Sequence, residues 1–207
     1  MPKIVDHDQY RKELLLKAFD LFAERGYGSL TMRQLAQGLG VSTGTLYHYF
    51  QSKEDLFLKL MEELAQQDFR EVEMTMATGG KTLEERIEAI FRWVESREEL
   101  FLKQILLSIS FYQEQHNSQE LVNGSQLLAT LNEGYRNLSK QYLGIEDPEL
   151  IQMLDALLSG LVLSRVFCLE KVSFQRQGQL LGKMLRAYVE RHYRESQLIG
   201  EEGSDGD

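Results

Sequence analysis

The sequence has few of the residues that break helices or build covalent frameworks. Its 207 residues include only two prolines, Pro2 and Pro148, and proline interrupts helices, so long stretches are free to be helical. The single cysteine, Cys168, can form neither an intramolecular disulfide nor a zinc framework, and we expect a protein of the reducing cytoplasm. No run shows the period-two alternation of β-branched residues that is typical of strands. These absences predict an all-α fold.

Signatures of catalysis are also missing. No glycine-rich phosphate loop precedes a helix, and no serine or cysteine nucleophile motif is present. The four histidines lie far apart in the sequence, at His7, His48, His116 and His192. We therefore expect no enzyme: no catalytic residues, no bound metal and no cofactor.

The chain does not open with a charged segment followed by an apolar one, so we expect no secretion. Its most apolar stretch, residues 150–169, contains Asp155 and Arg165. Charged side chains are costly inside a membrane, so this pattern favours a buried interface helix over a membrane span.

The most informative segment is residues 31–53, which read TMRQLAQGLGVSTGTLYHYFQSK. Its apolar residues begin at helical spacing, and a short second helical stretch, residues 43–50, follows Gly40. Two short helices joined by a turn that contains glycine are the signature of a helix-turn-helix, and Gly40 can supply the positive φ of that turn. We predict that Val41, Leu46 and Phe50 pack inward. The polar residues that remain face outward: Ser42, Thr43, Thr45, Tyr47, His48 and Tyr49.

A longer pattern surrounds this segment. Residues 23–27 read AERGY and residues 29–31 read SLT. They are followed by Leu35-Ala36, by GVSTGTLYHYF at residues 40–50 and by SKEDL at residues 52–56. Over roughly residues 10–64 the pattern resembles the TetR family of one-component transcriptional regulators. Beyond residue 64 only length and helical character agree. The resemblance implies an N-terminal three-helix helix-turn-helix DNA-binding domain and a C-terminal helical bundle for ligand binding and dimerisation.

The resemblance also carries DNA-contacting roles onto individual positions. Thr31 and Arg33, at the start of the second helix, resemble family positions that touch a phosphate and a base edge. Arginine suits guanine because its guanidinium can donate two parallel bonds to O6 and N7. The N-terminal end of the recognition helix, where base edges come closest, comprises Ser42, Thr43, Gly44 and Thr45. Thr45 can also be read as a packing residue at the helix turn.

Four further positions complete the expected DNA surface. Tyr47 and Tyr49 resemble positions whose ring or hydroxyl lies against the sugar-phosphate backbone. Lys53, at the start of the next helix, would make a charge-assisted phosphate contact. For His48, contact with a base or phosphate and a plain surface position both stay open.

The net charge of −9 at first argues against DNA as a partner. Residues 1–60, however, hold eight basic and seven acidic side chains, so the acidic surplus lies in the rest of the chain. A net charge of +1 is still weak for a nucleic-acid module, which usually shows a basic patch. We expect modest non-specific affinity and a reliance on dimerisation.

Expected helix starts and ends divide the chain into domains. We expect a DNA-binding domain over residues 8–68, an effector-binding and dimerisation domain over residues 80–196, and a disordered acidic tail over residues 197–207. Helices are expected at 8–25 and 52–76, with the helix-turn-helix between them, and then at 82–96, 97–115, 118–143, 148–170 and 174–194. Gly26 and Gly144 are expected helix ends, Thr31 with Gln34 and Ser52 with Asp55 are expected caps, and Asp147-Pro148 is an expected helix start.

Large apolar side chains between residues 81 and 143 can simply fill a helical core. TetR-like proteins hold an effector site in this region, and the mixture predicts an apolar or amphipathic small molecule. The candidate effector residues are Phe91, Trp93, Phe101, Ile105, Tyr112, Leu131 and Tyr135. The resemblance further implies that the last two helices pair with their copies in a homodimer. The candidate interface residues are Leu157, Gly160, Leu161, Ser164, Leu181, Leu185 and Tyr188.

The leading interpretation is a ligand-responsive repressor that binds a palindromic, double-stranded operator as a homodimer. An enzyme has little support, for the reasons given above. A helical adaptor that binds another protein is the third class, and the presence of Arg33, Tyr47, Tyr49 and Lys53 disfavours it. No membrane partner is expected.

Overall fold

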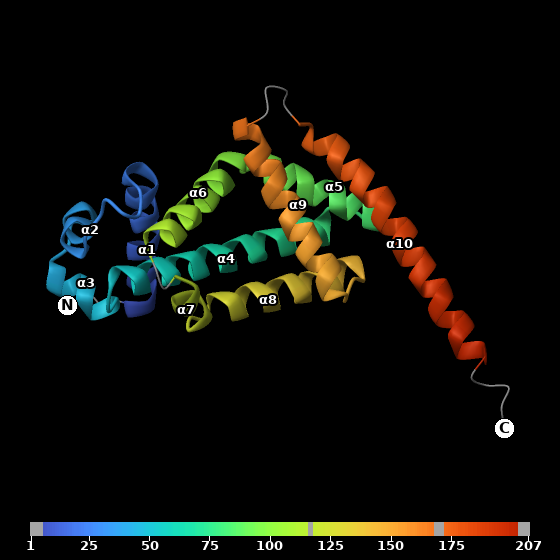
Figure 1. Cartoon of the computed structure of the whole chain (residues 1–207), viewed down its shortest axis with the longest axis horizontal. Helices are drawn as coiled ribbons and strands as arrows, with labels where there is room; N and C mark the ends of the chain where they lie inside the picture. Colours follow the sequence, from blue (N-terminus) through green and yellow to red (C-terminus); the bar gives the residue numbers. More distant parts are fainter. Residues whose placement is uncertain (1–5, 116–117, 168–171, 203–207) are drawn as a thin grey trace. The chain divides into compact units, whose positions relative to one another are not determined.

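A computed structural model describes residues 6–115, 118–167 and 172–202 of the chain. In these residues it is built from helices, with no strand (Figure 1). The helices are α1 (His7–Arg25), α2 (Met32–Leu39), α3 (Thr43–Tyr49), α4 (Lys53–Thr78), α5 (Leu83–Ser96), α6 (Glu98–Glu114), α7 (Ser118–Asn123), α8 (Leu127–Leu138), the short π-helix η1 (Ser139–Leu143), α9 (Pro148–Phe167) and α10 (Phe174–Glu202). The all-α fold is confirmed.

The chain forms two compact units. The first comprises Met1–Asp68 and Glu99–Gly134, and the second comprises Phe69–Glu98 and Tyr135–Asp207. Residues of α6 and α7 therefore belong to the same unit as the helix-turn-helix. The division at residues 68 and 80 stays a prediction about functional domains, and the compact units do not follow it.

The core of the first unit is aromatic. Phe22, Tyr27 and Phe57 are almost completely buried and touch one another at ring-centroid distances between 5.1 and 5.9 Å. Phe111 of α6 closes this cluster, because its ring stacks on Phe57 with centroids 4.5 Å apart. Val122 of α7 belongs to the same core. Residues from α6 and α7 thus complete the core beneath the helix-turn-helix.

Local signals in the sequence fix the N-terminal helix boundaries. The Thr31 hydroxyl accepts a bond from the Gln34 backbone N–H, and the Gln34 side chain accepts one from the Thr31 backbone N–H. Ser52 caps α4 by accepting from the Asp55 N–H at 3.1 Å. Gly26 and Gly40 end α1 and α2 with φ of 79° and 71°, values that favour glycine because other side chains are strained there. These predicted caps and stops are confirmed.

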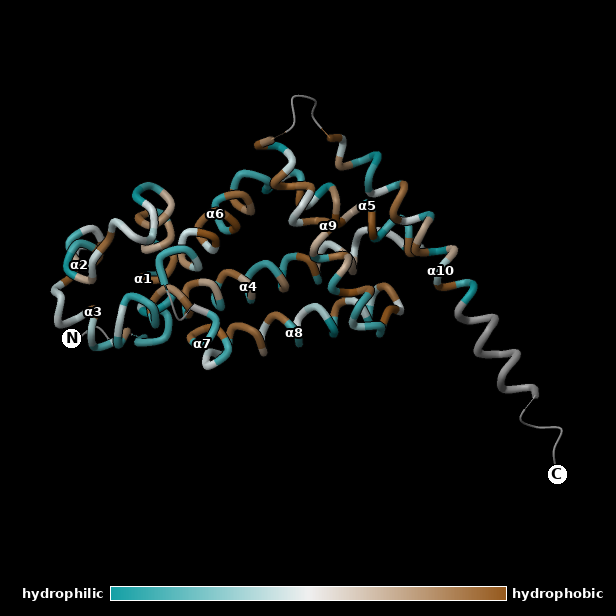
Figure 2. Tube along the Cα trace, viewed as in Figure 1, coloured by the Kyte–Doolittle hydropathy of each residue, from teal (hydrophilic) through white to brown (hydrophobic). Residues whose placement is uncertain are grey.

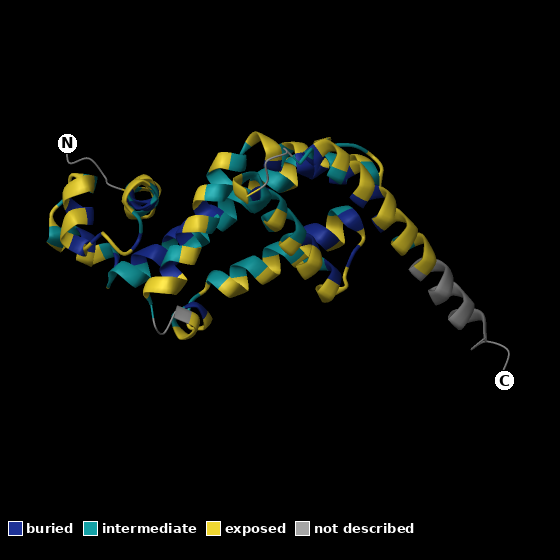
Figure 3. Ribbon diagram, turned by 45° about the horizontal axis from the view of Figure 1, so that its top comes forward, coloured by how far each residue is buried: buried dark blue, intermediate teal, exposed yellow. Residues whose placement is uncertain are grey.

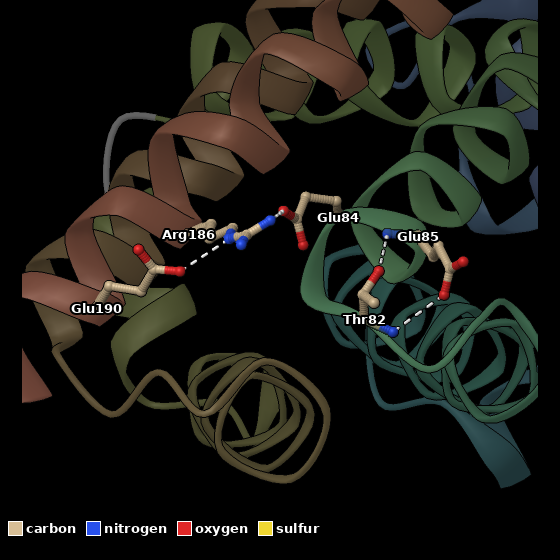
Figure 4. A network of polar contacts seen from close by, with 5 residues as sticks. All are labelled: Thr82, Glu84, Glu85, Arg186 and Glu190. Atoms are coloured by element: carbon tan, nitrogen blue, oxygen red, sulfur yellow. Dashed lines mark hydrogen bonds and ion pairs between the residues drawn. The ribbon is translucent and has the colours of Figure 1, made fainter.

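In the second unit α5 and α10 lie side by side (Figure 1). Two glycines allow the close approach, since a Cβ at Gly178 would lie 3.0 Å from the Phe91 side chain and one at Gly182 would lie 3.1 Å from the Glu84 Cα. Figure 4 shows the polar edge of this contact, where Arg186 bonds both Glu84 and Glu190 at 2.9 and 2.8 Å. The hydrogen bonds of Glu84 with its own backbone and with Arg186 lower the pKa of its carboxyl.

Figure 4 also shows the cap that begins α5. The Thr82 hydroxyl accepts from the Glu85 N–H at 3.2 Å, and the Glu85 carboxylate accepts from the Thr82 N–H at 3.0 Å. The bonds that its carboxylate accepts from the Thr82 and Lys81 backbone N–H groups lower the pKa of Glu85. At the start of α9, Asp147 accepts from the Glu149 N–H at 2.9 Å and Pro148 is the first helical residue, as predicted.

Two expectations about helix extent were wrong. The single helix expected over residues 118–143 is instead α7, α8 and η1, because the chain turns at Gly124 and Ser125 after Asn123. Gly144, with φ of 68°, does end this region as predicted. The last helix was expected to stop near residue 194 but continues to Glu202, into the segment expected to be a disordered tail. Residues 168–171 and 203–207, including Cys168, lie outside the described residues.

Helix α9 is rich in apolar residues (Figure 2). By length and composition alone it is apolar enough to cross a membrane, a test that core helices of soluble proteins also pass. Several of its side chains are solvent-exposed in the single chain, among them Met153, Val166 and Phe167. The expectation of a buried interface helix remains a prediction, because a partner would have to cover these side chains.

Candidate DNA-binding surface

The second and third helices are held by a small apolar core. Leu35 and Ala36 of α2 and Leu46 of α3 are buried, and so is Phe50, which directly follows α3. Val41, in the turn, is only partly buried. The backbone N–H groups of Gly40 and Val41 donate to carbonyls of α2, which closes the turn. The helix-turn-helix predicted from the residue spacing is therefore present.

One face of α3 is free of this core. Tyr47 is 52% exposed, and Ser42, Gly44 and His48 are also exposed. Thr43, Thr45 and Tyr49 are only partly buried, which is less outward than predicted. Figure 3 shows this alternation of buried and exposed residues on the N-terminal helices. The exposed face carries hydroxyls, aromatic rings and an imidazole, with no acidic side chain in residues 41–50.

The N-terminal end of α3 is fixed by hydroxyl groups. Ser42 accepts from the Thr45 N–H at 2.9 Å, and the two side-chain hydroxyls lie 2.8 Å apart. Gly44 is not required by packing within the chain, because an added Cβ would meet only the Ser42 hydroxyl at 3.7 Å. A close approach of DNA to Gly44 remains the prediction.

The predicted residues at the starts of α2 and α4 lie in the same compact unit as α3. Thr31 caps α2 with its hydroxyl 2.8 Å from the Gln34 side-chain oxygen, and Arg33 in the first turn is exposed. Lys53, the first residue of α4, donates to the Tyr27 carbonyl at 3.2 Å, and its ammonium lies 4.1 Å from the centre of the Tyr27 ring. An ammonium has three N–H donors. A phosphate contact by Lys53 therefore remains chemically open.

A partly buried polar cluster lies beside Lys53, on the buried Tyr27. The Tyr27 hydroxyl donates to Glu54 at 3.2 Å, and the Gln115 side chain donates to both groups at 3.1 Å. Burial and the charge of Glu54 raise the pKa of Tyr27. Burial alone would raise the pKa of Glu54, but hydrogen bonds from its own backbone, from Ser52 and from Tyr27 outweigh that effect and lower it. Sequence reasoning missed this cluster because Gln115 lies 61 residues from Glu54.

A second missed residue lies at the start of α1. The Nδ1 atom of His7 lies 2.9 Å from the hydroxyl of Tyr49, the last residue of α3. The Tyr49 ring also makes edge contacts with Tyr10, at 5.7 Å, and with His48, at 5.1 Å. No local sequence signal could have indicated this contact, since it spans 42 residues.

The candidate effector residues are divided between the two units. Phe91, Trp93 and Tyr135 belong to the second; Phe101, Ile105, Tyr112 and Leu131 belong to the first. Phe91 is buried, Tyr112 is 51% exposed and the other five are partly buried. The Trp93 indole donates to Glu71 at 3.2 Å, and the Tyr135 hydroxyl donates to Asp155 at 2.7 Å. An effector site formed by these residues remains a prediction.

The candidate dimer residues also separate into two groups. Leu157, Leu161 and Ser164 of α9 are partly buried, and Gly160 is exposed. On α10 Tyr188 is exposed, whereas Leu181 and Leu185 are buried. Leu181 and Leu185 lie on the face of α10 that carries Gly178 and Gly182, and that face packs on α5 of the same chain. Their assignment to the interface remains a prediction.

Among the residues that the structure describes, no group of three or more His, Cys, Asp or Glu side chains could hold a metal ion.

Comparison with known proteins assigns the helix-turn-helix. Residues 14–60 match the family described as bacterial regulatory proteins, tetR family. The HTH-type transcriptional repressor KstR2 of Mycobacterium tuberculosis is 47% identical over 51 residues, which are 25% of this chain and 26% of that protein.

The HTH-type transcriptional regulator BetI of Rhizobium meliloti is 30% identical over 122 residues, 58% of this chain and 59% of that protein. The chain thus matches about a quarter of the length of KstR2 and less than two thirds of BetI. Solved structures match over more of the chain. FadR of Bacillus subtilis in complex with stearoyl-CoA has a TM-score of 0.59 at 22% identity, over 85% of this chain and 97% of that one. Reduced NemR of E. coli has a TM-score of 0.60 at 20% identity, over 86% and 96%.

The capped helices, the glycine turn and the exposed polar face of α3 form a helix-turn-helix. The N-terminal sequence of the chain matches named repressors, and its fold matches solved structures along most of its length. The helix-turn-helix region of the chain belongs to the TetR family of transcriptional regulators.

Proposed function

We propose that this protein is a homodimeric repressor that binds a palindromic operator and is released by a small apolar or amphipathic effector. The observation that carries the proposal is the α3 surface, where exposed Tyr47, His48 and Ser42 stand on a helix fixed from behind by buried Leu46 and Phe50. A short helix of this kind can enter the major groove, where base edges carry a distinct pattern of donors and acceptors.

The dimer is needed because one helix-turn-helix reads only a half-site. A two-fold dimer presents two recognition helices to a palindrome. The apolar side chains available for such an interface are exposed on the last two helices. They are Met153, Val166 and Phe167 of α9, and Leu180, Met184 and Tyr188 of α10. Leu180, Met184 and Tyr188 are spaced four residues apart, so they share one stripe of α10, next to the stripe that packs on α5.

Release by an effector follows from linkage. A ligand lowers operator affinity only as far as it prefers a conformation that cannot bind DNA, and DNA then weakens ligand binding by the same factor. α4 begins with Lys53 in the first unit and continues to Thr78 in the second, so a ligand that shifts α4 would also move α3. The FadR relative in fold is bound to stearoyl-CoA, an amphipathic molecule, which supports this class of effector.

The first experiment is selection of bound fragments from a pool of genomic DNA, followed by a mobility-shift assay on the enriched fragments. We expect a small set of fragments that share a palindromic sequence, called the operator below. A matched control is the variant Gln179→Glu, which changes one exposed residue of α10 and leaves the α3 surface intact. Enrichment by wild type and by Gln179→Glu but not by Tyr47→Ala supports the proposal. No enrichment by wild type contradicts it.

The effector is tested by isothermal titration calorimetry. A panel of fatty acyl-CoA and other amphipathic molecules is titrated into the protein alone and into its complex with the operator. An effector must bind the complex more weakly than the free protein. Equal affinities in both titrations show a molecule that binds without acting as inducer.

A further inference from the structure

The contact between His7 and Tyr49 joins the first residue of α1 to the last residue of the recognition helix. The Nδ1 atom of His7 lies 2.9 Å from the Tyr49 hydroxyl, within hydrogen-bond distance. The Tyr49 ring is also flanked by His7, Tyr10 and His48, with centroid distances of 6.2, 5.7 and 5.1 Å. α1 thus restricts both the ring and the hydroxyl of a residue expected to contact DNA.

We propose that His7 is a positioning residue for Tyr49 and that protonation of His7 strengthens DNA binding. This inference rests on the proposed function, because it requires the Tyr49 hydroxyl to meet a phosphate oxygen of bound DNA.

The reason is the single proton of a tyrosine hydroxyl. When Nδ1 of a neutral histidine has no proton, it accepts from the hydroxyl, and that hydroxyl has no second proton to give to a phosphate. When Nδ1 carries a proton, it donates to the tyrosine oxygen and the hydroxyl proton is free. Phosphate oxygens only accept, so only this second arrangement forms the chain His7 to Tyr49 to phosphate.

Protonation of His7 enforces the productive arrangement. In an imidazolium both ring nitrogens carry protons, so Nδ1 can only donate. The charge also adds one cation near the DNA backbone, where cations replace condensed counterions. A neutral His7 can reach the same hydrogen bond only as the tautomer with the proton on Nδ1. DNA binding should therefore be accompanied by proton uptake in the range where histidine side chains change charge, between about pH 5 and 8.

The charged neighbours of His7 in the sequence of the first helix are Asp6, Asp8 and Arg11. From α3, Tyr49 contacts His7 and His48 contacts Tyr49, and no other titratable side chain occurs between residues 41 and 50 except Tyr47. A phosphate brought to Tyr49 adds a negative charge that favours the imidazolium.

The test is fluorescence anisotropy of labelled operator DNA between pH 5.5 and 8.5, at constant salt, with full-length wild type and variants. We expect wild-type affinity to rise about tenfold from pH 8 to pH 6, the effect of one charge-assisted hydrogen bond. His7→Phe should bind with little change over this range. His7→Gln, whose amide can donate to Tyr49 but cannot ionise, should keep most of the affinity at pH 8 and lack the gain at pH 6.

Two further variants isolate the pair. Tyr49→Phe keeps the ring and removes the hydroxyl, and adding His7→Phe to it should cost much less than His7→Phe costs wild type at pH 6. His192→Phe, in α10 and in the other compact unit, should keep the wild-type pH profile. A His7→Phe profile that parallels wild type, while both bind operator, overturns this inference and leaves the proposed function intact. Failure of wild type to bind DNA at any pH overturns both.

Discussion

The Tyr27 hydroxyl donates a 3.2 Å hydrogen bond to Oε1 of Glu54, and the Gln115 side chain donates to both oxygens at 3.1 Å. Tyr27 precedes α2, Glu54 is in the first turn of α4, and Gln115 directly follows α6. The contact therefore fixes α6 to the base of the helix-turn-helix within one compact unit. It is a candidate route by which movement of α6 would reach Lys53, which lies against the Tyr27 ring.

Tyr27→Phe should destabilise the protein, because it removes the hydroxyl that bonds both Glu54 and Gln115, which then keep only their bond to each other. The expected loss is about 1–3 kcal/mol in the free energy of unfolding at neutral pH, the usual contribution of a hydrogen bond that involves a charged group. The measurement is urea denaturation followed by circular dichroism. A loss close to zero would show that the hydroxyl contributes no net stability.

Tyr27→Phe should also change how the free energy of unfolding depends on pH under alkaline conditions. The pKa of Tyr27 is raised in the folded state above the ordinary value of 10.0, so below pH 10 both states keep the proton and stability is unaffected by its titration. Above about pH 10 the unfolded state ionises first, and the free energy of unfolding falls. Tyr27→Phe should fall less steeply than wild type in this range. Parallel slopes would contradict the raised pKa.

The glycines of α10 and α9 should respond in opposite ways to substitution. Gly182→Leu must separate α10 from α5, where a Cβ already meets the Glu84 Cα at 3.1 Å, and overpacking of this kind costs about 1–3 kcal/mol. At Gly160 no described atom lies within 4 Å of an added Cβ, so Gly160→Ala should stabilise an isolated chain by up to about 1 kcal/mol. Thermal unfolding of both variants, at protein concentrations that keep the chain monomeric, gives the comparison. Equal effects at the two sites would contradict the placement of α10 on α5.

The exposed face of α10 should control dimerisation. Met184→Glu places a charge on a side chain that is 59% exposed in one chain, so the chain should still fold while the dimer weakens. Gln179→Glu introduces the same charge elsewhere on α10 and should leave the dimer intact. Sedimentation equilibrium measures both dissociation constants. If Met184→Glu leaves the dimer dissociation constant unchanged, this face of α10 lies outside the interface.

Arg33 and Lys53 should make different kinds of DNA contact. Arg33→Ala should relax the preference at one base pair in each half-site, at about 1–3 kcal/mol, because arginine reads guanine through two bonds. Lys53→Ala should weaken binding to all sequences and lower the salt slope by about one unit. Titrations of operator and scrambled DNA at several salt concentrations separate the two effects. Equal losses of specific and non-specific binding by both variants would show that Arg33 does not read a base.

The helix-turn-helix was predictable because its determinants are local. Thr31 with Gln34, Gly40 and Ser52 with Asp55 are caps and stops that act within four residues, so the sequence specifies where each helix begins and ends. The turn at Gly124 was missed although glycine was present, because apolar residues at helical spacing continue on both sides of it. Here local periodicity could not indicate a break.

The sequence could not predict which side of α10 packs on the same chain, and the reason is different. Leu180, Leu181, Met184 and Leu185 give this helix two adjacent apolar stripes, and the sequence does not say which stripe the same chain covers. The structure resolves the ambiguity through Gly178 and Gly182, which allow α5 to approach on the side of Leu181 and Leu185. Contacts between distant residues, such as His7 with Tyr49, leave no periodic signal at all.

The most direct test of the account is a footprint of the purified protein on the operator. Two recognition helices of one dimer must fall about one helical turn apart, roughly 34–36 Å, or a multiple of it. We therefore predict two protected half-sites related by two-fold symmetry at such a spacing, and their loss with Tyr47→Ala. Protection of a single half-site, or a footprint that Tyr47→Ala leaves unchanged, would contradict the assignment of α3 as the recognition helix of a dimeric regulator.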